Sequence, residues 1–267
     1  QLTQPNLSQC EFYNESNGES EFSSFKKMIT EKFQPDIFVV SANHIKSKII
    51  KDNITFLLKD VCPNVQIPVV YGNCNIPYIF MMTPNLHVGL ENYNSFIKQA
   101  ISLARYKQNP LGEILNLWTE DANTNKCLSL KLHHLQKKIN PWKIMERLRL
   151  EAVRVVNMVG LDFYKLYKLD HLKKTLNFCC GLGPNKANRL ISYTIDYESK
   201  NNNFPGLPSR NEIALILTPK VGDNASGFIR VKVPACNTTR KEYQNSNVIN
   251  YLDMTRIHPN QYGITKG

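Results

Sequence analysis

The sequence predicts an α/β domain followed by an all-helical domain. In the first 82 residues apolar patterns alternate between helical and strand spacing, whereas from residue 140 to residue 200 they are helical. A chain of 267 residues is long enough for two or three domains. Apolar residues make up 42% of the chain and charged residues 21%, which is ordinary globular usage and argues against wholesale disorder.

The N-terminal part is expected to alternate between helices and strands. Residues 1–22 are polar and aperiodic, and they are expected to form a loop. Apolar residues at helical spacing predict helices over residues 22–33 and 46–60. Runs of β-branched and aromatic residues predict three buried strands. These strands are residues 37–40, 67–71 and 78–82.

Two further helices should follow before a domain boundary. Residues 93–108 carry one apolar stripe at positions i, i+4, i+7 and i+8. The stripe comprises Phe96, Ala100, Leu103 and Ala104. Asn109-Pro110 ends this helix and opens a short one that runs through Trp118. The polar residues 119–126 predict a loop at the main domain boundary, and residues 128–135 are compatible with a short strand.

The clearest single element is a helix between Asn140 and Gly160. Asn140 is a good N-cap, Pro141 suits the first helical position, and Gly160 is a typical C-terminal stop. The predicted buried stripe lies on one face of this helix. It comprises Ile144, Leu148, Ala152, Val155 and Val159.

The sharpest local signal is a helix-hairpin-helix pattern in residues 176–191, LNFCCGLGPNKANRLI. Gly181-Leu182-Gly183 permits a tight turn and a close approach of the backbone to a ligand. A second helix should begin at Pro184, so that the amides of the turn and the positive end of this helix point the same way. Such an arrangement binds phosphate without reading bases. The alternative is a plain α–α corner in which the glycines serve only the turn.

Charge supports a polyanionic ligand for this segment. The chain has a formal charge of +11, and residues 131–200 contribute 14 basic and 6 acidic side chains, a net of +8. Lys186 and Arg189 lie within one turn of the predicted hairpin. The expected partner is therefore nucleic acid, bound through the backbone at Gly181, Leu182, Gly183, Lys186 and Arg189. A solvated basic face without a ligand is the alternative.

The sequence favours neither a metal site nor a membrane segment. The seven cysteines include no CxxC pair, and they are expected to be reduced, partly buried thiols. No run approaches 18 uninterrupted apolar residues, so no membrane-spanning helix is predicted. The chain lacks an initiator Met and a visible secretory signal, and we expect it to be a fragment of a longer protein.

Six segments together resemble one known family. In chain order they are QAISLARYKQNPLGE (99–113), LSLKLHHLQ (128–136), VVNMVGLDF (155–163), FCCGLGPNKA (178–187), PKVGDNASGFIRV (219–231) and YLDMTRIHPNQY (251–262). This order and spacing resemble the Suppressor-of-Ty-Six family of eukaryotic transcription elongation factors and histone chaperones, whose bacterial relative is Tex. The resemblance covers about residues 30–267.

The resemblance implies a domain layout and a function. Residues 1–125 would form a YqgF-like, RNase H-like α/β domain, residues 126–248 a tandem helix-hairpin-helix domain, and residues 249–267 the start of a small helical domain. The S1 and SH2 domains of the family would lie outside this chain. By resemblance, the partners are histones and the RNA polymerase II elongation complex, and the location is the nucleus.

Three departures from the family pattern qualify this prediction. The second hairpin reads Thr218-Pro219-Lys220, without the glycine that usually precedes Pro-Lys, and Gly222 replaces a typical aromatic residue. We therefore expect the second hairpin to serve packing more than phosphate binding. His134 stands where the family usually has proline, and the neighbouring His133 is expected to be a core or hydrogen-bonded histidine.

The remaining question is whether the α/β domain is a nuclease. A two-metal RNase H-like site needs several converging carboxylates. The strand ends instead offer Ser41-Ala42-Asn43 and Gly72-Asn73, residues 93–108 contain no acid, and Asp36 alone cannot hold two metals. The sequence thus predicts a non-catalytic elongation-factor core without a metal or cofactor. A metal-dependent RNase H-like nuclease or resolvase is the alternative.

Overall fold

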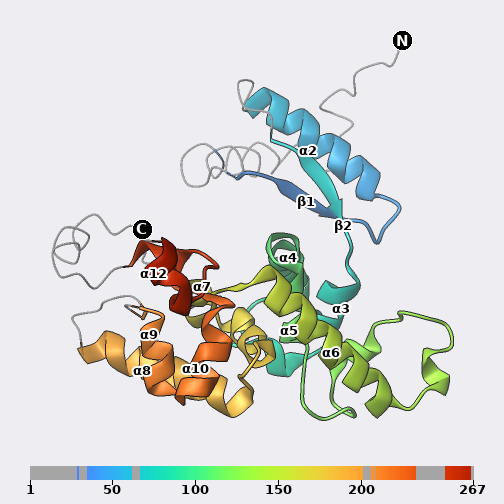
Figure 1. Cartoon of the computed structure of the whole chain (residues 1–267). Helices are drawn as coiled ribbons and strands as arrows, with labels where there is room; N and C mark the ends of the chain where they lie inside the picture. The colour runs from blue at the N-terminus through green and yellow to red at the C-terminus, as the bar shows by residue number, and fades with distance from the viewer. Residues whose placement is uncertain are drawn as a thin grey trace. The chain divides into compact units, whose positions relative to one another are not determined.

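The computed structural model describes residues 29, 35–61, 67–200, 206–207, 209–232 and 250–265 (Figure 1). The chain divides into two compact units. One contains residues 1–82 with 90–108, and the other contains residues 83–89 with 109–267. The predicted loop at 1–22 lies outside the described residues, as does all of the predicted helix at 22–33 except Ile29, which is buried.

The first unit contains a β-α-β crossover. Strand β1 (Phe38–Ser41) pairs in parallel with β2 (Val69–Gly72), and helix α2 (Ser47–Val61) connects them and packs on both. Parallel neighbours need such a crossover, and here it follows from one helical and two strand patterns in sequence. The strands and helix predicted at 37–40, 67–71 and 46–60 are confirmed to within two residues.

The prediction of a third strand, at residues 78–82, is wrong. These residues lie in helix α3 (Asn75–Met81), which buries Ile76, Pro77 and Phe80. Ile76 and Phe80 are four residues apart and share one helix face, whereas a short apolar run fits a strand and a buried helix equally well. Helix α3 packs against α4 (Ser95–Gln108).

The apolar stripe predicted for α4 is only partly buried. Leu103 and Ser102 face inward, while Phe96, Ala100 and Ala104 are exposed, Phe96 to 75%. The buried face is set by the contacts of α4 with α3 and β1 rather than by the count of apolar residues. Gly72 at the end of β2 makes this approach possible, since a Cβ there would lie 2.7 Å from the Leu103 side chain.

In its described residues, the second unit contains helices and one two-residue parallel strand pair. Its elements are η3 (Pro84–Leu86), α5 (Pro110–Asn116), η4 (Lys126–Ser129), η5 (Gln136–Lys138), α6 (Pro141–Val159), β3 (Leu161–Asp162), α7 (Phe163–Lys168), η6 (Asp170–Phe178), α8 (Pro184–Lys200), α9 (Asn211–Ile216), α10 (Pro219–Ser226), β4 (Ile229–Arg230), η7 (Tyr251–Met254), η8 (Pro259–Gln261) and α12 (Tyr262–Thr265). Fully buried apolar side chains from successive helices form its core. They include Phe163, Leu176, Phe178, Leu190 and Ile213.

The caps predicted for the long helix α6 are confirmed. The Asn140 side chain accepts a hydrogen bond from the Trp142 amide at 3.0 Å, Pro141 occupies the first turn, and Gly160 ends the helix at φ 78°. Helix α6 contacts η4 and η6.

The buried face of α6 differs from the predicted stripe by about one position. Ala152 is buried as expected, but Val159 is 54% exposed and the remaining predicted residues are half-buried. Met145 and Val156 are buried instead and, with Ala152, follow i, i+7 and i+11 spacing. Val159 lies in the last turn, after the last buried residues of the helix.

Residues 128–135 do not form the predicted strand. Part of the segment belongs to η4, and the rest is a loop fixed by one side chain. The Gln136 amide donates to the Leu128 carbonyl at 2.8 Å and accepts from the Leu132 amide at 3.0 Å. A side chain thus takes the place of the partner strand that the alternating leucines would require. Within the described part of the chain, no helix has the length and apolar character of a membrane span.

Side chains of residues 250–265 hydrogen-bond to backbone carbonyls near the C-terminal ends of α6 and α10. The Arg256 guanidinium donates to the carbonyls of Asn157 and Met158 at the end of α6, at 2.8 and 2.6 Å. His258 Nδ1 accepts from the Asn260 amide, so Nε2 carries the proton and donates to the Asp223 carbonyl of α10 at 2.9 Å. Cations and donors at helix C-termini satisfy carbonyls that the helix itself cannot.

Candidate nucleic-acid interface

The predicted first hairpin is present as two helices joined by a short turn. The 3₁₀ helix η6 ends at Phe178, and α8 begins at Pro184, as the sequence predicts. Gly181 adopts φ +84°, in the left-handed region that favours glycine, whereas the φ of Gly183 is not positive. A Cβ on Gly183 would meet nothing within 4 Å. Gly181 is therefore the residue whose conformation makes the turn.

The turn presents amides and the positive end of α8 on an exposed surface. The Leu182 amide donates to the Cys179 carbonyl at 3.0 Å, which closes the turn. By helix geometry the amides of Asn185 and Lys186 have no acceptor within α8, and both residues are exposed. Together with the helix dipole, these amides favour an anion at this end of the helix.

The two predicted basic side chains lie beside this turn. Lys186 and Arg189 are both exposed and three residues apart, so they share one side of α8. The Lys186 ammonium donates to the Gly181 carbonyl at 3.2 Å. This contact also supports the turn, so Lys186 contributes to the shape of the hairpin as well as to its charge.

The sequence-based prediction did not include Asn157, whose side chain hydrogen-bonds to the backbone just before the hairpin turn. Its side-chain amide donates to the Phe178 carbonyl at 3.3 Å, and its oxygen accepts from the Cys180 amide at 3.0 Å. Asn157 is buried on α6. A polar residue within an apolar helix stripe was the available signal, because buried amides are nearly always hydrogen-bonded.

The second hairpin has a different construction. Helix α9 meets α10 through Leu217-Thr218, without a glycine in the turn. The close approach is made one turn later, at Gly222, where a Cβ would lie 2.4 Å from the Ala214 Cα. Lys220 is exposed in the first turn of α10. The missing aromatic residue at position 222 is thus explained, because only glycine fits against α9 there.

The two hairpins pack on each other. A Cβ on Gly181 would lie 3.3 Å from both the Val221 carbonyl and the Asn224 Cβ of α10. Strand β3 also pairs with β4, which brings the end of α6 beside the end of α10. The second hairpin therefore backs the turn of the first.

An internal network anchors the second hairpin to residues 250–265. The buried Arg210 guanidinium donates to the carbonyls of Asp253 and Ile257, at 3.0 to 3.2 Å and 2.6 Å. The Asp253 carboxylate accepts from the Arg210 amide and from the Tyr262 hydroxyl. Burial lowers the pKa of Arg210 and raises the pKa of Tyr262.

The histidines and cysteines singled out by sequence have structural surroundings. His133 is exposed, and its Nδ1 accepts from the Leu135 amide at 3.1 Å, so it is a hydrogen-bonded histidine. Cys74, Cys127 and Cys179 are buried free thiols, and Cys180 is half-buried. Burial raises the pKa of Cys127 and of Cys179 to about 12. The other cysteines lie outside the described residues: Cys10, Cys62 and Cys236.

The carboxyl ends of β1 and β2 meet without a carboxylate. Ser41 is paired with Gly72, and the Cys74 thiol donates to the Ser41 hydroxyl at 3.0 Å. Asn43 and Asn73 follow the two strands, and Asp36 precedes β1 at the other end. Among the described residues, no three His, Cys, Asp or Glu side chains are grouped closely enough to hold a metal ion.

Comparisons with known proteins agree with the hairpin geometry. A family model described as a helix-hairpin-helix motif matches residues 125–232. A Suppressor of Ty 6 homolog from Caenorhabditis briggsae is 35% identical over 166 residues, which is 62% of this chain and 10% of that protein. The chain is related to the Suppressor of Ty 6 elongation factors. The resemblance drawn from the six sequence segments is therefore confirmed.

Two longer matches extend this relationship along the chain. The transcription elongation factor SPT6-like protein of Arabidopsis thaliana is 29% identical over 261 residues, 90% of this chain and 18% of that protein. The transcription elongation factor SPT6 of Drosophila melanogaster is 26% identical over 248 residues, 91% of this chain and 12% of that protein. The chain thus spans 10–18% of the length of these three relatives.

Proposed function

We propose that residues 176–191 bind the sugar–phosphate backbone of DNA or RNA, within a non-catalytic core of a transcription elongation factor. The observation that carries this proposal is the exposed turn at the N-terminus of α8, with Lys186 and Arg189 beside it. The turn Gly181-Leu182-Gly183, which the Leu182 amide closes, would bring a phosphate oxygen to the amides of Asn185 and Lys186 at the start of α8. Gly181, Leu182 and Gly183 carry no hydrogen-bonding side chain, so contacts through the backbone amides would be independent of base sequence.

The finer parts of the proposal rest on the family resemblance of the six sequence segments. We infer that the chain acts in the nucleus, on chromatin, with histones and the RNA polymerase II elongation complex as partners of the whole protein. We also infer that residues 1–125 have a YqgF-like, RNase H-like fold and residues 126–248 a tandem helix-hairpin-helix fold, with residues 109–125 packed in the second unit. The parallel β1-α2-β2 crossover is compatible with the first of these folds.

The alternative, a metal-dependent RNase H-like nuclease, has little support at the sheet edge where its acids would be needed. The positions that follow β1 and β2 carry Asn43 and Asn73. A plasmid and a labelled DNA hairpin, incubated with the protein in Mg²⁺ or Mn²⁺, would distinguish the two functions. Metal-dependent cleavage that persists through repeated purification would contradict the non-catalytic proposal.

The binding proposal is tested by fluorescence anisotropy with labelled single-stranded and duplex oligonucleotides of unrelated sequence. Because counterion release drives phosphate binding, we expect weak affinity that varies little with sequence and falls steeply with salt. Equal binding across a range of salt concentrations, or a strong preference for one sequence, would contradict backbone recognition by the hairpin.

A further inference from the structure

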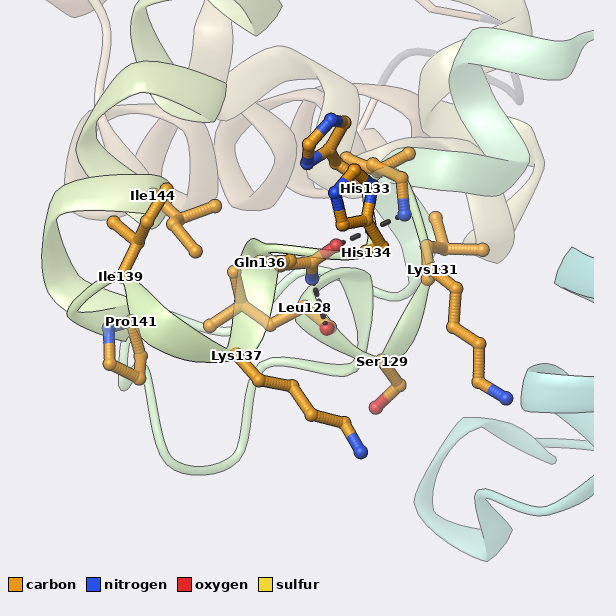
Figure 2. Close-up of a pocket in the computed structure, with 12 residues that line it drawn as sticks. Leu128, Ser129, Lys131, His133, His134, Gln136, Lys137, Ile139, Pro141 and Ile144 are labelled. Atoms are coloured by element: carbon orange, nitrogen blue, oxygen red, sulfur yellow. Dashed lines mark hydrogen bonds between the residues drawn. The ribbon is translucent and has the colours of Figure 1, made fainter.

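A cavity of about 630 Å³ lies between the loop of residues 128–137 and the start of α6 (Figure 2). None of the hairpin residues 176–191 lines it. Its volume lies within the range of 300–1,000 Å³ that is usual for sites that enclose a ligand group. The nucleic-acid proposal leaves this cavity without a role.

The walls of the cavity are held in place by the protein itself. The Gln136 side chain bonds to both Leu128 and Leu132, which fixes the loop on one side (Figure 2). Asn140 caps α6 and fixes the other side. A cavity with a fixed wall costs little conformational entropy to fill, which favours binding.

The lining combines aliphatic side chains with lysines. Leu132 is 62% exposed and Ile139 50% exposed, although both line the cavity. Figure 2 shows Ile139, Pro141 and Ile144 grouped at one end, and the Lys131 and Lys137 side chains extending from the loop toward the other. Exposed aliphatic groups at a formed cavity are typical of an interaction site.

The charged side chains that line the cavity are lysines, so its charge is positive. Residues 126–144 contain five lysines and no aspartate or glutamate. Lys131 and Lys137 are both exposed, so their positive charge is available to a ligand at the cavity mouth. A ligand that complements this surface carries negative charge beside aliphatic or aromatic groups.

We propose that this cavity is the docking site of an acidic peptide segment of a partner protein, with apolar side chains inserted among Leu132, Ile139 and Ile144. The carboxylates of the segment would pair with Lys131 and Lys137. A nucleic acid fits less well, because the lining contains no Phe, Tyr or Trp on which a base could stack. The two histidine rings in the lining instead contact each other, with centroids 4.1 Å apart.

The test uses the whole chain and a short fluorescein-labelled peptide in which Asp and Glu alternate with Leu and Phe. We expect saturable anisotropy that is lost when the Leu and Phe of the peptide become Ser or its acids become Lys. In the protein, the double variants Leu132→Ser/Ile139→Ser and Lys131→Glu/Lys137→Glu should each weaken binding about tenfold. These four side chains are exposed, so thermal melts should match those of the wild type.

Two matched controls come from the same unit. Leu215 is 76% exposed on α9 and Lys165 is exposed on α7, and neither lines the cavity. Leu215→Ser and Lys165→Glu should leave peptide binding unchanged. Absence of peptide binding by the wild type, or binding by both double variants as tight as that of the wild type, would overturn the proposal. Displacement of the peptide by oligothymidine that itself depends on Leu132 and Ile139 would overturn it too, because the cavity would then bind nucleic acid.

Discussion

The two hairpins of the second unit share a plan but place their glycines differently. In the first hairpin, Gly181 lies in the turn at positive φ, ahead of a helix that begins with Pro184. In the second, the turn has no glycine and Gly222 lies inside α10, where it meets Ala214. Gly181 thus determines the conformation of an exposed turn, whereas Gly222 allows two helices to pack closely. The first hairpin is therefore suited to ligand contact, and the second to support.

The surroundings of the hairpins differ in the same way. The turn of the first is exposed at Gly181 and Lys186. The second is tied to residues 250–265 by the buried Arg210 and Asp253 and by His258. A hairpin that departs from a binding motif can therefore still be important for the fold, because the residues that replace the motif can stabilise the packing.

The largest expected effect is at Gly222. We expect Gly222→Ala to destabilise the second unit by about 3 kcal/mol or more, because the added methyl would lie 2.4 Å from a backbone atom of α9. Thermal and urea unfolding, followed by circular dichroism, measure this loss. A Gly222→Ala variant as stable as the wild type would show that the two helices can separate without cost, and the support role would fail.

A smaller effect is expected within the first turn. Gly181→Ala should cost about 2 kcal/mol, because a residue with a Cβ is strained at φ +84° and the Cβ would press on α10. Gly183→Ala is the matched control, because Gly183 lies two residues later in the same turn, has no positive φ and has open space where a Cβ would be added. Its stability should be unchanged or raised by up to about 1 kcal/mol. Equal losses for both variants would contradict the assignment of Gly181 as the residue that makes the turn.

The buried thiols give a third prediction, about the contact between the hairpins. The Cys179 thiol lies 4.0 Å from the Ala225 carbonyl of α10, and its pKa is raised to about 12. Its neutral form is therefore favoured in the folded state, so stability is full below pH 9 and declines as the pH rises from 9 toward 12. The loss at pH 10 should be about 1 kcal/mol for this thiol.

Alkylation measures the same contact at lower pH. At pH 8 iodoacetamide should modify Cys180, which is half-buried, well before it modifies Cys179 or Cys127. Mass spectrometry of the native and urea-unfolded protein gives the order. Rapid modification of native Cys179 would mean that the two hairpins separate readily. It would contradict the conclusion that the second hairpin supports the turn of the first.

The sequence predicted the local features well and the packing less well. Asn140, Pro141 and Gly160 marked the ends of α6 because caps are local signals. Phe96 and Val159 were expected to be buried and are exposed, because the buried face depends on which neighbour each helix meets. The strand prediction for residues 78–82 failed because a short, continuous apolar run has no periodicity that distinguishes a strand from a helix.

The same division applies to the candidate interface. The hairpin residues, and Pro184 as the start of α8, were visible as a motif of glycine, proline and charge. Asn157, which bonds to both sides of the turn, lies more than twenty residues earlier in the chain, and no local pattern connects it with residues 176–191. The reason for glycine at position 222 became visible only with Ala214 beside it.

The contrast between the hairpins is tested most directly by the salt dependence of duplex DNA binding, measured by anisotropy for three variants. The Lys186→Ala/Arg189→Ala variant should bind all sequences more weakly and should lower the slope of log K against log salt by about two, one for each lost phosphate contact. Lys220→Ala, at the corresponding end of α10, should leave the slope close to that of the wild type, as should Lys165→Ala. An unchanged affinity and slope for the double variant, or a loss for Lys220→Ala as large as that for the double variant, would contradict the account.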